Sequence, residues 1–309
     1  MNNSFHLYGQ EKVKLIPHQV PDEVVVSVCI QAFNHGHFIG HCIDSVLMQE
    51  TNFKFEILLG EDNSSDDTRR ICLEYAKKYP DRIELFLHDR SNVICIDNNP
   101  TGRYNFIYNL LGCRGKYIAL LDGDDYWTDP YKLQKQIDFL EKNSSYAGCF
   151  HYTQELNTGA SDGKIYGKYG TKLDFDTNDT FSITTLFHTS SFVFRRDALF
   201  IPDWFTKVVS GDMALFSIVS AKGKLRCIPE VMSVYRKHEG GLTKSKVVVD
   251  NYHKNRIQLM NYLNEFHQFK YDREAKKIIS FHQRSLAGIP EKVDLLTLLK
   301  QKIRKIINK

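Results

Sequence analysis

Three aspartates within a short stretch form the strongest chemical signal in the sequence. Asp122, Asp124 and Asp125 directly follow the apolar run 117–121. Carboxylates this close repel one another and raise one another's pKa values unless a cation neutralises them. Their oxygens suit Mg²⁺ or Mn²⁺, which one or two carboxylates hold while substrate phosphates take other positions. The alternative is a solvated turn before the helix at Pro130, but a turn does not need three acids behind a buried strand.

A second polar cluster follows the strand-like run 55–59. Glu61 and Asp62 stand at the end of this run, where an aspartate can accept a hydrogen bond from the N–H of a nucleobase. Phe33, after the strand-like run 24–30, is placed to pack on such a base, although a single aromatic residue is more often part of the core. The residues that come next also fit a plain helix N-cap: Ser64, Ser65, Asp66 and Thr68.

The elements that must position these clusters alternate between strand and helix patterns. Strands are expected at 24–30, 55–59, 83–87 and 117–121, and helices at 38–47, 66–79, 106–111 and 130–140. This alternation predicts an α/β protein with a mostly parallel sheet and helices on both faces. Ligands of such sheets bind beyond the carboxyl ends of the strands, so the polar clusters should meet at one edge. The polar segment 157–180 is expected to form a long loop or a hairpin flap.

Composition excludes several classes of protein. The 309 residues are 42% hydrophobic and 25% charged, which is unlike a collagen-like or broadly disordered chain. No apolar run approaches the roughly 18 residues that span a bilayer, and the first twenty residues do not resemble a secretory signal. Seven cysteines without a C-x-x-C pair predict reduced, mostly buried thiols and a cytoplasmic protein.

Charge is distributed unevenly along the chain. Acidic residues outnumber basic ones in 1–243, which argues against nucleic-acid binding, whereas 244–309 is basic and has a helical pattern. Residues 1–21 show no clear period and are expected to be a poorly fixed lead-in. Near the end of the chain, apolar residues recur at helical spacing between lysines and arginines: Leu295, Leu296, Leu299, Ile303, Ile306 and Ile307. Such a helix suits the inner face of a membrane, or it packs on the body of the protein or on a second subunit.

The clusters together resemble a known family. The stretches 26–34, 56–68 and 116–127 are similar to the first strand, the nucleobase-binding strand and the D-x-D metal motif of family 2 glycosyltransferases. The similarity continues through 189–191, 211–213 and 233–241 and covers about residues 22–243. The resemblance implies the GT-A fold, a Rossmann-like sheet, over 22–243, with a nucleotide-binding half at 22–128 and an acceptor half at 129–243. The helical region 244–309 would be an extension of this fold.

The resemblance also implies roles for individual residues. Asp62 would bind the base, Asp124 and His238 would bind Mn²⁺ or Mg²⁺, and Asp212 would be the general base of an inverting transfer. Asp122 and Asp125 would lie at or near the metal. The other expected contacts to the donor, a nucleoside diphosphate sugar that is UDP-linked in much of the family, are Ala32, Phe33, Asn34, Asp122, Gly123 and Arg236. The acceptor would be a carbohydrate or a lipid-linked sugar of cell-surface polysaccharide or glycoconjugate synthesis.

Each later residue also has a plainer interpretation. Asp212 precedes an apolar helix and is a good N-cap, and His238 fits a surface turn. His188 is more often a hydrogen-bonding or core residue, and Arg103 and Asn105 fit a solvated helix start better than a phosphate site. Three positions depart from the family: Phe33 replaces a commoner tyrosine, Asp67 a glycine, and Gly211 an acidic residue.

Two rival functions stay open at this stage. A nucleotidyltransferase that makes sugar nucleotides would need a basic, glycine-rich loop after the first strand, but 31–40 contains neither lysine nor arginine. A non-catalytic nucleotide-sugar binding protein would not need the acid at 212. The sugar, the acceptor, the linkage and the oligomeric state do not follow from the sequence.

Overall fold

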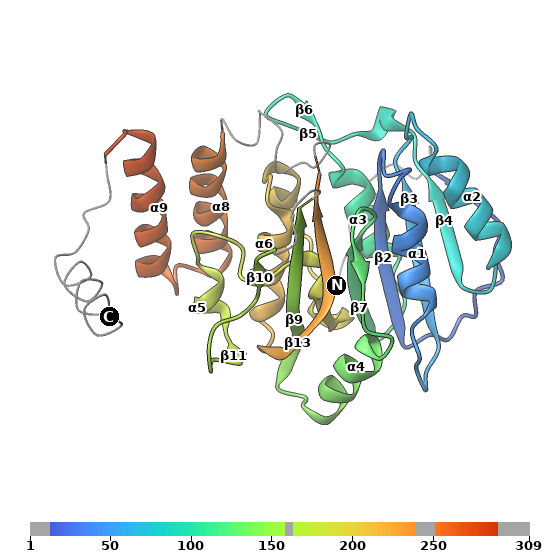
Figure 1. The fold of residues 1–309 in the computed structure, drawn as a ribbon. Helices are drawn as coiled ribbons and strands as arrows, with labels where there is room; N and C mark the ends of the chain where they lie inside the picture. Colours follow the sequence, from blue (N-terminus) through green and yellow to red (C-terminus); the bar gives the residue numbers. More distant parts are fainter. Residues whose placement is uncertain (1–12, 158–162, 239–250, 290–309) are drawn as a thin grey trace, which may run out of the picture.

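The computed structural model describes residues 13–157, 163–238 and 251–289. A mixed sheet with strand order β1-β4-β3-β2-β7-β12-β9-β13-β11 runs through the molecule, and helices cover both of its faces (Figure 1). The prediction of an α/β fold with a mostly parallel sheet is therefore confirmed for the first half. In the second half of the chain, antiparallel strands join this sheet.

The first half is the parallel part of the sheet. β2 (Val26–Ala32) lies between β3 (Phe55–Glu61) and β7 (Tyr117–Asp122), and β4 (Ile83–Leu87) follows β3. The side chains of β2 and β3 are nearly all buried, as expected of strands covered on both faces. At their carboxyl ends, β2, β3 and β7 extend one or two residues beyond the apolar runs predicted from the sequence, whereas β4 ends where its run does. The polar residues Glu61 and Asp122 are thus the last residues of their strands.

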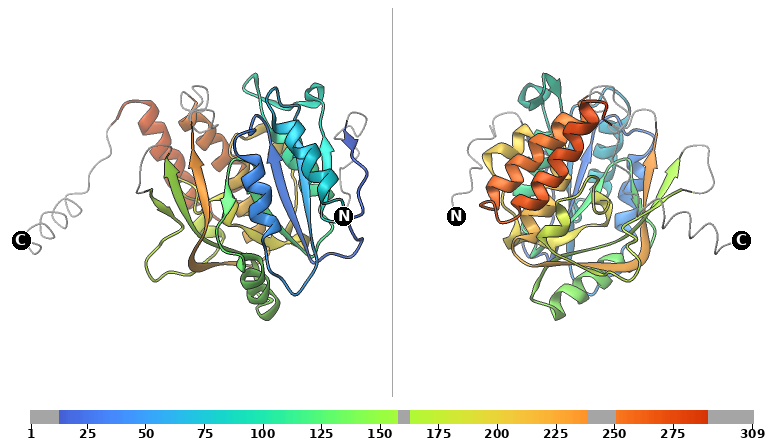
Figure 2. Two further views of the ribbon diagram at one scale, coloured as in Figure 1. Left: turned by 45° about the vertical axis from the view of Figure 1, so that its right-hand side comes forward. Right: turned by 90° about the vertical axis from the view of Figure 1, so that its left-hand side faces the viewer.

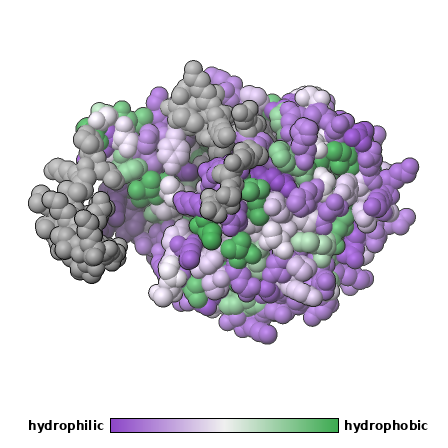
Figure 3. Space-filling model, in the orientation of Figure 1, coloured by the Kyte–Doolittle hydropathy of each residue, from purple (hydrophilic) through white to green (hydrophobic). Residues whose placement is uncertain are grey.

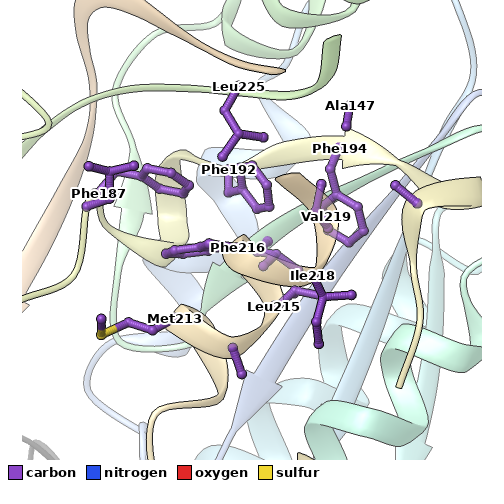
Figure 4. Close-up of a cluster of buried hydrophobic side chains, with 14 of the residues drawn as sticks. Ala147, Phe187, Phe192, Phe194, Met213, Leu215, Phe216, Ile218, Val219 and Leu225 are labelled. Carbon is purple, nitrogen blue, oxygen red and sulfur yellow. The ribbon is translucent and has the colours of Figure 1, made fainter. Parts of the chain in front are cut away.

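Two apolar cores lie on the two faces of the sheet. One packs α1 (Ile39–Leu47), α2 (Thr68–Lys78) and α4 (Lys132–Lys142) against the sheet. The other packs α3 (Arg103–Gly112) and α6 (Gly211–Ser220) on the opposite face. Figure 4 shows phenylalanines at the centre of this second core, where Phe216 of α6 lies against Phe187 and Phe192.

The second half adds strands of both directions. β12 (Val193–Arg195) runs antiparallel to β7 and β9 (Tyr146–Asn157), whereas β9 and β13 (Lys224–Lys237) are parallel. The expected flap at 157–180 is in part a hairpin, because β10 (Ile165–Tyr166) pairs antiparallel with β9. The segment then forms β11 (Asp174–Phe175), which pairs with β13, and the short helix α5 (Thr177–Thr180).

The remaining elements are short. The described part of the lead-in, residues 13–21, is less loose than predicted, because β1 (Lys14–Leu15) pairs with β4 at the sheet edge. The other strands are β5 (Cys95–Ile96), β6 (Asn99–Pro100) and β8 (Tyr126–Trp127). The 3₁₀ helices are η3 (Arg90–Asn92), η4 (Thr189–Ser191), η5 (Arg196–Ala198) and η6 (Asp203–Lys207).

Two helices of the basic region pack side by side at the end of the molecule away from α1 and α2 (Figures 1 and 2). These are α8 (Tyr252–Phe266) and α9 (Asp272–Leu286). The apolar helical stripe expected at 295–307 lies outside the described residues. Within the described ranges no helix is long and apolar enough to cross a bilayer.

Polar residues dominate the face seen in Figure 3, and most cysteines lie in the interior. The face of the molecule in Figure 3 is mostly hydrophilic, with apolar residues in small groups. Six of the seven cysteines are buried, Cys95 is exposed, and all seven are free thiols. The expectation that most cysteines are buried is confirmed.

Candidate active site

The carboxyl ends of β2, β3 and β7 meet at one edge of the sheet. Gln31 is in register with Asp122 of β7, and Ala32 with Glu61 of β3. The backbone N–H of Asp62 donates to the carbonyl of Ala32 at 3.0 Å. The polar clusters that follow these three strands in the sequence are therefore neighbours in space.

Asp62 lies in a buried position beside two residues with which a base could interact. Its Oδ2 accepts a hydrogen bond from Nη1 of Arg90 at 2.7 Å. The same guanidinium stands over the ring of Phe33 at 4.2 Å from its centroid, a cation–π contact. Burial raises the pKa of Asp62 to about 6, although the charge of Arg90 opposes this rise. Phe33 is 38% exposed, so it is not a core residue.

The loops after β2 and β3 are joined to each other by hydrogen bonds. Asn34 has a positive φ of 55°, its Oδ1 accepts from the N–H of Ser65, and its own N–H donates to Ser64. Asp66 accepts from the backbone N–H groups of Gly36 and Thr68. The expected N-cap function of this cluster is thus only partly confirmed, because Asp66 caps the first turn while the position before α2 is Asp67, which makes no cap bond. The network fixes the loops that border Asp62.

The three aspartates at the end of β7 differ in burial and surroundings: Asp125 is buried, whereas Asp122 and Asp124 are half-buried. Burial, together with the negative charges of Asp124 and Asp212, raises the pKa of Asp122 to about 7. Burial also raises the pKa of Asp125, which accepts a hydrogen bond from the backbone N–H of Arg236 at 2.9 Å. Burial acts in the same direction on Asp124, yet a hydrogen bond with His238 and the charge of His35 lower the pKa of Asp124 below its ordinary value. Asp124 is therefore the most readily ionised of the three.

Two imidazoles face Asp124. The Nε2 atoms of His238 and His35 lie 3.1 Å and 3.8 Å from its Oδ2. His238 thus lies against the acid cluster, and the interpretation as an isolated surface histidine is wrong. Gly123 leaves room for this arrangement, because a Cβ there would come within 2.8 Å of both His35 Nδ1 and the carbonyl of Gln31.

Arg236 joins the end of β13 to the acid cluster. Its guanidinium donates to the carbonyl of Asp124 at 2.8 Å, lies 4.3 Å from the ring centroid of Tyr126 and contacts His41. A positive group is thereby held beside Asp124 and Asp125, where the phosphates of a nucleotide would need neutralising charge.

Asp212 lies in the first turn of α6. The N-cap position belongs to Ser210, so the N-cap interpretation of Asp212 is wrong. The charge of Asp212 acts on both Asp122 and His188, which places it at the same edge as the acid cluster. Arg103 lies beneath this turn and is buried. It donates to the carbonyls of Val208 and Val209 at 2.9 Å.

The structure corrects one more sequence-based interpretation, confirms another and adds two residues. Arg103 and Asn105 do not form a solvated helix start, because both are buried and Asn105 donates to the carbonyl of Gly60. His188 is a hydrogen-bonding residue, as expected, and its ring accepts from the N–H of Ser190. Sequence analysis missed Arg90, His35 and the position of Arg103. Arg90 could have been found by extending the strand-end rule to the strand 83–87, which Arg90 follows by three residues.

The donor set fits a divalent cation that a substrate helps to bind. Within the described ranges, no group of three or more His, Cys, Asp or Glu side chains forms a complete metal site by itself. Asp124 and His238 supply a carboxylate and an imidazole, and Oδ2 of Asp125 has no hydrogen-bond partner among the described residues. Such a partial set leaves coordination positions for phosphate oxygens, as Mg²⁺ sites commonly do.

The mostly parallel sheet, with Asp62 and the acid cluster at the carboxyl ends of its strands, defines an α/β protein whose polar side chains gather at one sheet edge. Residues 27–201 match the Glycosyl transferase family 2 profile, and the chain belongs to this family. It is 31% identical to an uncharacterized protein of Mycobacterium tuberculosis over 71% of this chain and 61% of the relative. It thus spans less than two thirds of that relative's length.

Two further comparisons extend this result. The chain is 28% identical to the Escherichia coli UDP-Glc:alpha-D-GlcNAc-diphosphoundecaprenol beta-1,3-glucosyltransferase WfaP, over 72% of this chain and 81% of that protein. Its fold is similar to S. aureus TarS 1-349 in complex with UDP-GlcNAc, with a TM-score of 0.60, 14% identity, and 88% and 76% of the two chains covered. The structural likeness supports the GT-A fold.

Proposed function

We propose that this chain transfers a sugar from a UDP-linked donor to an acceptor hydroxyl with inversion, aided by Mn²⁺ or Mg²⁺. The observation that carries the proposal is the common edge at which Asp62, Asp124 and Asp212 lie. A nucleotide base, a diphosphate and an acceptor hydroxyl need such neighbouring subsites. The relatives named above include WfaP, whose name gives UDP-Glc as the donor, and a structural neighbour was solved with UDP-GlcNAc.

The donor's base would lie between Phe33 and Asp62. The ionised carboxylate of Asp62 accepts from the imide N–H of uracil, and the Phe33 ring offers an apolar surface for the base. Arg90 holds Asp62 in place and favours its charged form. Ala32 and Asn34 fix the border of this subsite.

The diphosphate would lie over the acid cluster. Asp124 and His238 are the proposed metal ligands, with Asp122 and Asp125 nearby, and Arg236, which contacts the backbone of Asp124, supplies positive charge. A divalent cation bound there would neutralise the negative charge that develops on the departing nucleoside diphosphate. Because Gly123 has no side chain, the backbone after β7 can approach the diphosphate closely.

Asp212 would act as the general base. It takes the proton from the acceptor hydroxyl while that oxygen forms a bond to the anomeric carbon, and the bond from this carbon to the diphosphate oxygen breaks. Attack from the face opposite the leaving group inverts the anomeric centre. Positioned general-base catalysis of this kind contributes on the order of 10²–10⁴-fold in rate.

The acceptor would be a carbohydrate or a lipid-linked sugar of cell-surface polysaccharide or glycoconjugate synthesis. WfaP is named for a GlcNAc-diphosphoundecaprenol acceptor, which is the basis for this class. A lipid-linked acceptor would place the enzyme at the cytoplasmic face of the membrane, with the basic C-terminal region as a surface contact or a dimer contact.

A thermal-shift panel with Mn²⁺ and UDP-Glc, UDP-GlcNAc and GDP-Man tests the donor, because a ligand of the native state stabilises it by mass action. Transfer is then measured with α-D-GlcNAc-diphosphoundecaprenol and a panel of simple glycosides, and the anomeric configuration of the product is read by NMR. UDP release coupled to an inverted product supports the proposal. Pyrophosphate release would identify a nucleotidyltransferase instead. Donor binding with neither hydrolysis nor transfer would identify a binding protein.

A further inference from the structure

His188 lies at the acid cluster but has no part in the proposed reaction as described so far. It is the residue before η4, and its Nδ1 lies 3.6 Å from Oδ2 of Asp125. The negative charges of Asp124 and Asp212 both act on its ring. His188 is therefore near both the proposed metal ligand and the proposed general base, in the half of the chain that we expect to bind the acceptor.

Apolar packing fixes the position of His188 relative to α6. Phe187, the preceding residue, stacks on Phe216 of α6 with ring centroids 4.0 Å apart (Figure 4). Both phenylalanines are buried. Phe216 follows Asp212 by four residues, a spacing that puts two side chains on the same face of a helix. A close-packed contact thus joins the loop of His188 to the helix that carries Asp212.

One nitrogen of the imidazole is held by a buried network. Nδ1 accepts a hydrogen bond from the backbone N–H of Ser190 at 3.3 Å and lies 2.9 Å from Oγ of the same residue. This hydroxyl donates to Oγ of Ser233 at 3.0 Å, which is hydrogen-bonded in turn to Thr153 at 2.9 Å. All three hydroxyl residues are buried. Tyr235 stacks on the imidazole with centroids 4.2 Å apart, so both the ring and its Nδ1 edge are fixed.

The other nitrogen, Nε2, has no hydrogen-bond partner among the residues that the structure describes. Unlike Nε2 of His151, it is not enclosed by the protein, and the His188 side chain keeps 14% of its surface exposed. A backbone N–H can only donate, so Nδ1 must carry the lone pair, and the proton of the neutral imidazole is then on Nε2. His188 therefore presents an oriented N–H donor at the edge where the acid cluster lies.

A purely structural role explains only one side of this ring. By accepting from the backbone of η4, His188 acts as an N-cap. A shorter polar side chain such as that of asparagine or serine caps at least as well. The cap and the hydroxyl network use Nδ1 alone, and they give no function to the donor at Nε2.

We infer that His188 binds the acceptor, with its Nε2–H donating a hydrogen bond to an oxygen atom of the acceptor sugar close to the hydroxyl that reacts. The inference rests on the proposed function, since it requires that the reacting hydroxyl lie at Asp212. Because the ring is already oriented, little conformational freedom is lost when the acceptor binds. His188 would then orient the acceptor, while Asp212 takes its proton.

Two substitutions separate the roles of the two nitrogens. His188→Asn keeps an oxygen near the position of Nδ1, where it can cap η4, but has no group at the position of Nε2. His188→Gln places its amide near the position of Nε2 and loses the cap. For both variants we measure kcat and KM for transfer to α-D-GlcNAc-diphosphoundecaprenol and the simple glycosides, the Kd of UDP with Mn²⁺, and unfolding in urea.

His188→Asn should lower kcat/KM for the acceptor about tenfold, the effect of one lost hydrogen bond, with unchanged UDP affinity and unchanged stability. His188→Gln should retain more of the acceptor kcat/KM although it unfolds at lower urea concentration. His18→Asn is the matched control, because Nδ1 of His18 also accepts from a backbone N–H two residues on, that of Val20. His18 lies near the amino end of β4, 3.6 Å from Glu84, so this variant should use the acceptor as the wild type does.

The inference is overturned if His188→Asn uses the acceptor as well as the wild type, or if His188→Gln is impaired as much as His188→Asn, which would show a structural role. A rise confined to the donor KM would also overturn it, by assigning His188 to the donor sugar. If the wild type itself transfers to none of the acceptors, the proposed function fails and this inference fails with it. Transfer by the wild type with an unimpaired His188→Asn ends the inference alone.

Discussion

The guanidinium of Arg103 occupies the space that a side chain at position 211 would need. A Cβ built on Gly211 would overlap this guanidinium, which also packs at 4.9 Å from the ring centroid of Phe205. Burial lowers the pKa of Arg103 to about 10, while the charge of Asp212 favours the protonated form. The buried guanidinium of Arg103 on α3 therefore supports the first turn of α6. Glycine at position 211, where the family resemblance would place an acidic residue, leaves room for it.

Replacing Gly211 with alanine should disturb this turn. The added methyl group forces Arg103 or the backbone to move, and overpacking of this kind costs about 1–3 kcal/mol. We expect Gly211→Ala to lower the free energy of unfolding in urea and to reduce kcat more than the donor KM. Gly40→Ala is the matched control, since its Cβ would meet Tyr75 at an ordinary 3.6 Å in the first turn of α1. Equal stability of the two variants would contradict the role of Arg103.

Asp212→Asn should abolish transfer while the donor still binds. The amide keeps the shape of the carboxylate but cannot accept the proton of the acceptor hydroxyl, so the rate should fall on the order of 10²–10⁴-fold. The check is kcat for transfer together with the Kd of UDP by calorimetry. Asp203→Asn, at an exposed position in η6, serves as control. Near-wild-type turnover of Asp212→Asn would remove the assignment of the base.

Asp124→Ala should weaken the part of UDP binding that depends on Mn²⁺. Asp124 is the acid of the cluster whose surroundings most favour the ionised form. Its loss should therefore remove most of the increase in UDP affinity that Mn²⁺ produces. Calorimetry of UDP with and without Mn²⁺ measures this gain, which we expect to fall at least tenfold while the metal-free affinity stays the same. Asp138→Ala on the exposed side of α4 should leave both values unchanged. An undiminished metal effect would place the cation elsewhere.

The sequence predicted the strand ends of the site because local patterns determine them. Apolar runs ending in Leu59 and Leu121 mark buried parallel strands, and the acids after them must then emerge at one edge. The pairings of Arg90 with Asp62 and of Arg103 with the α6 turn could not be predicted in this way. An arginine's long side chain reaches partners that are distant in the chain, so the tertiary fold decides its role.

The antiparallel second half had no comparably clear pattern. β12 has three residues and β10 two, too few for a periodic pattern to show.

Phe33→Ala should weaken nucleotide binding through the base. The change removes the apolar surface for the base and the ring that Arg90 covers, and base–aromatic stacking is worth about 1–3 kcal/mol. We expect the Kd of uridine and that of UDP to rise by a similar factor, about tenfold or more. Phe33→Tyr should retain affinity, and Phe200→Ala, at a remote exposed ring, should have no effect. Unchanged uridine binding in Phe33→Ala would place the base elsewhere.

His88 should make the protein less stable in mild acid. Its side chain is 2% exposed and packs edge-on against Tyr104 and Tyr108, and burial lowers the pKa of His88 to about 4. The unfolded chain binds this proton at a pKa of about 6.5, so between these values it binds more protons than the native state and stability falls as the pH falls. The loss from this one group should reach up to about 3 kcal/mol near pH 4.

The variant His88→Phe keeps an aromatic ring between the tyrosines but removes the proton site. The free energy of unfolding, measured in urea from pH 7 to pH 4, should therefore fall less steeply for His88→Phe than for the wild type. Other histidines whose pKa values are lowered by burial, among them His151 and the half-buried His267, contribute to the slope of both proteins, so the difference between the two slopes isolates His88. His37→Phe, at an exposed residue, should keep the wild-type slope. Parallel curves for wild type and His88→Phe would mean that His88 is not held neutral by its burial against Tyr104 and Tyr108.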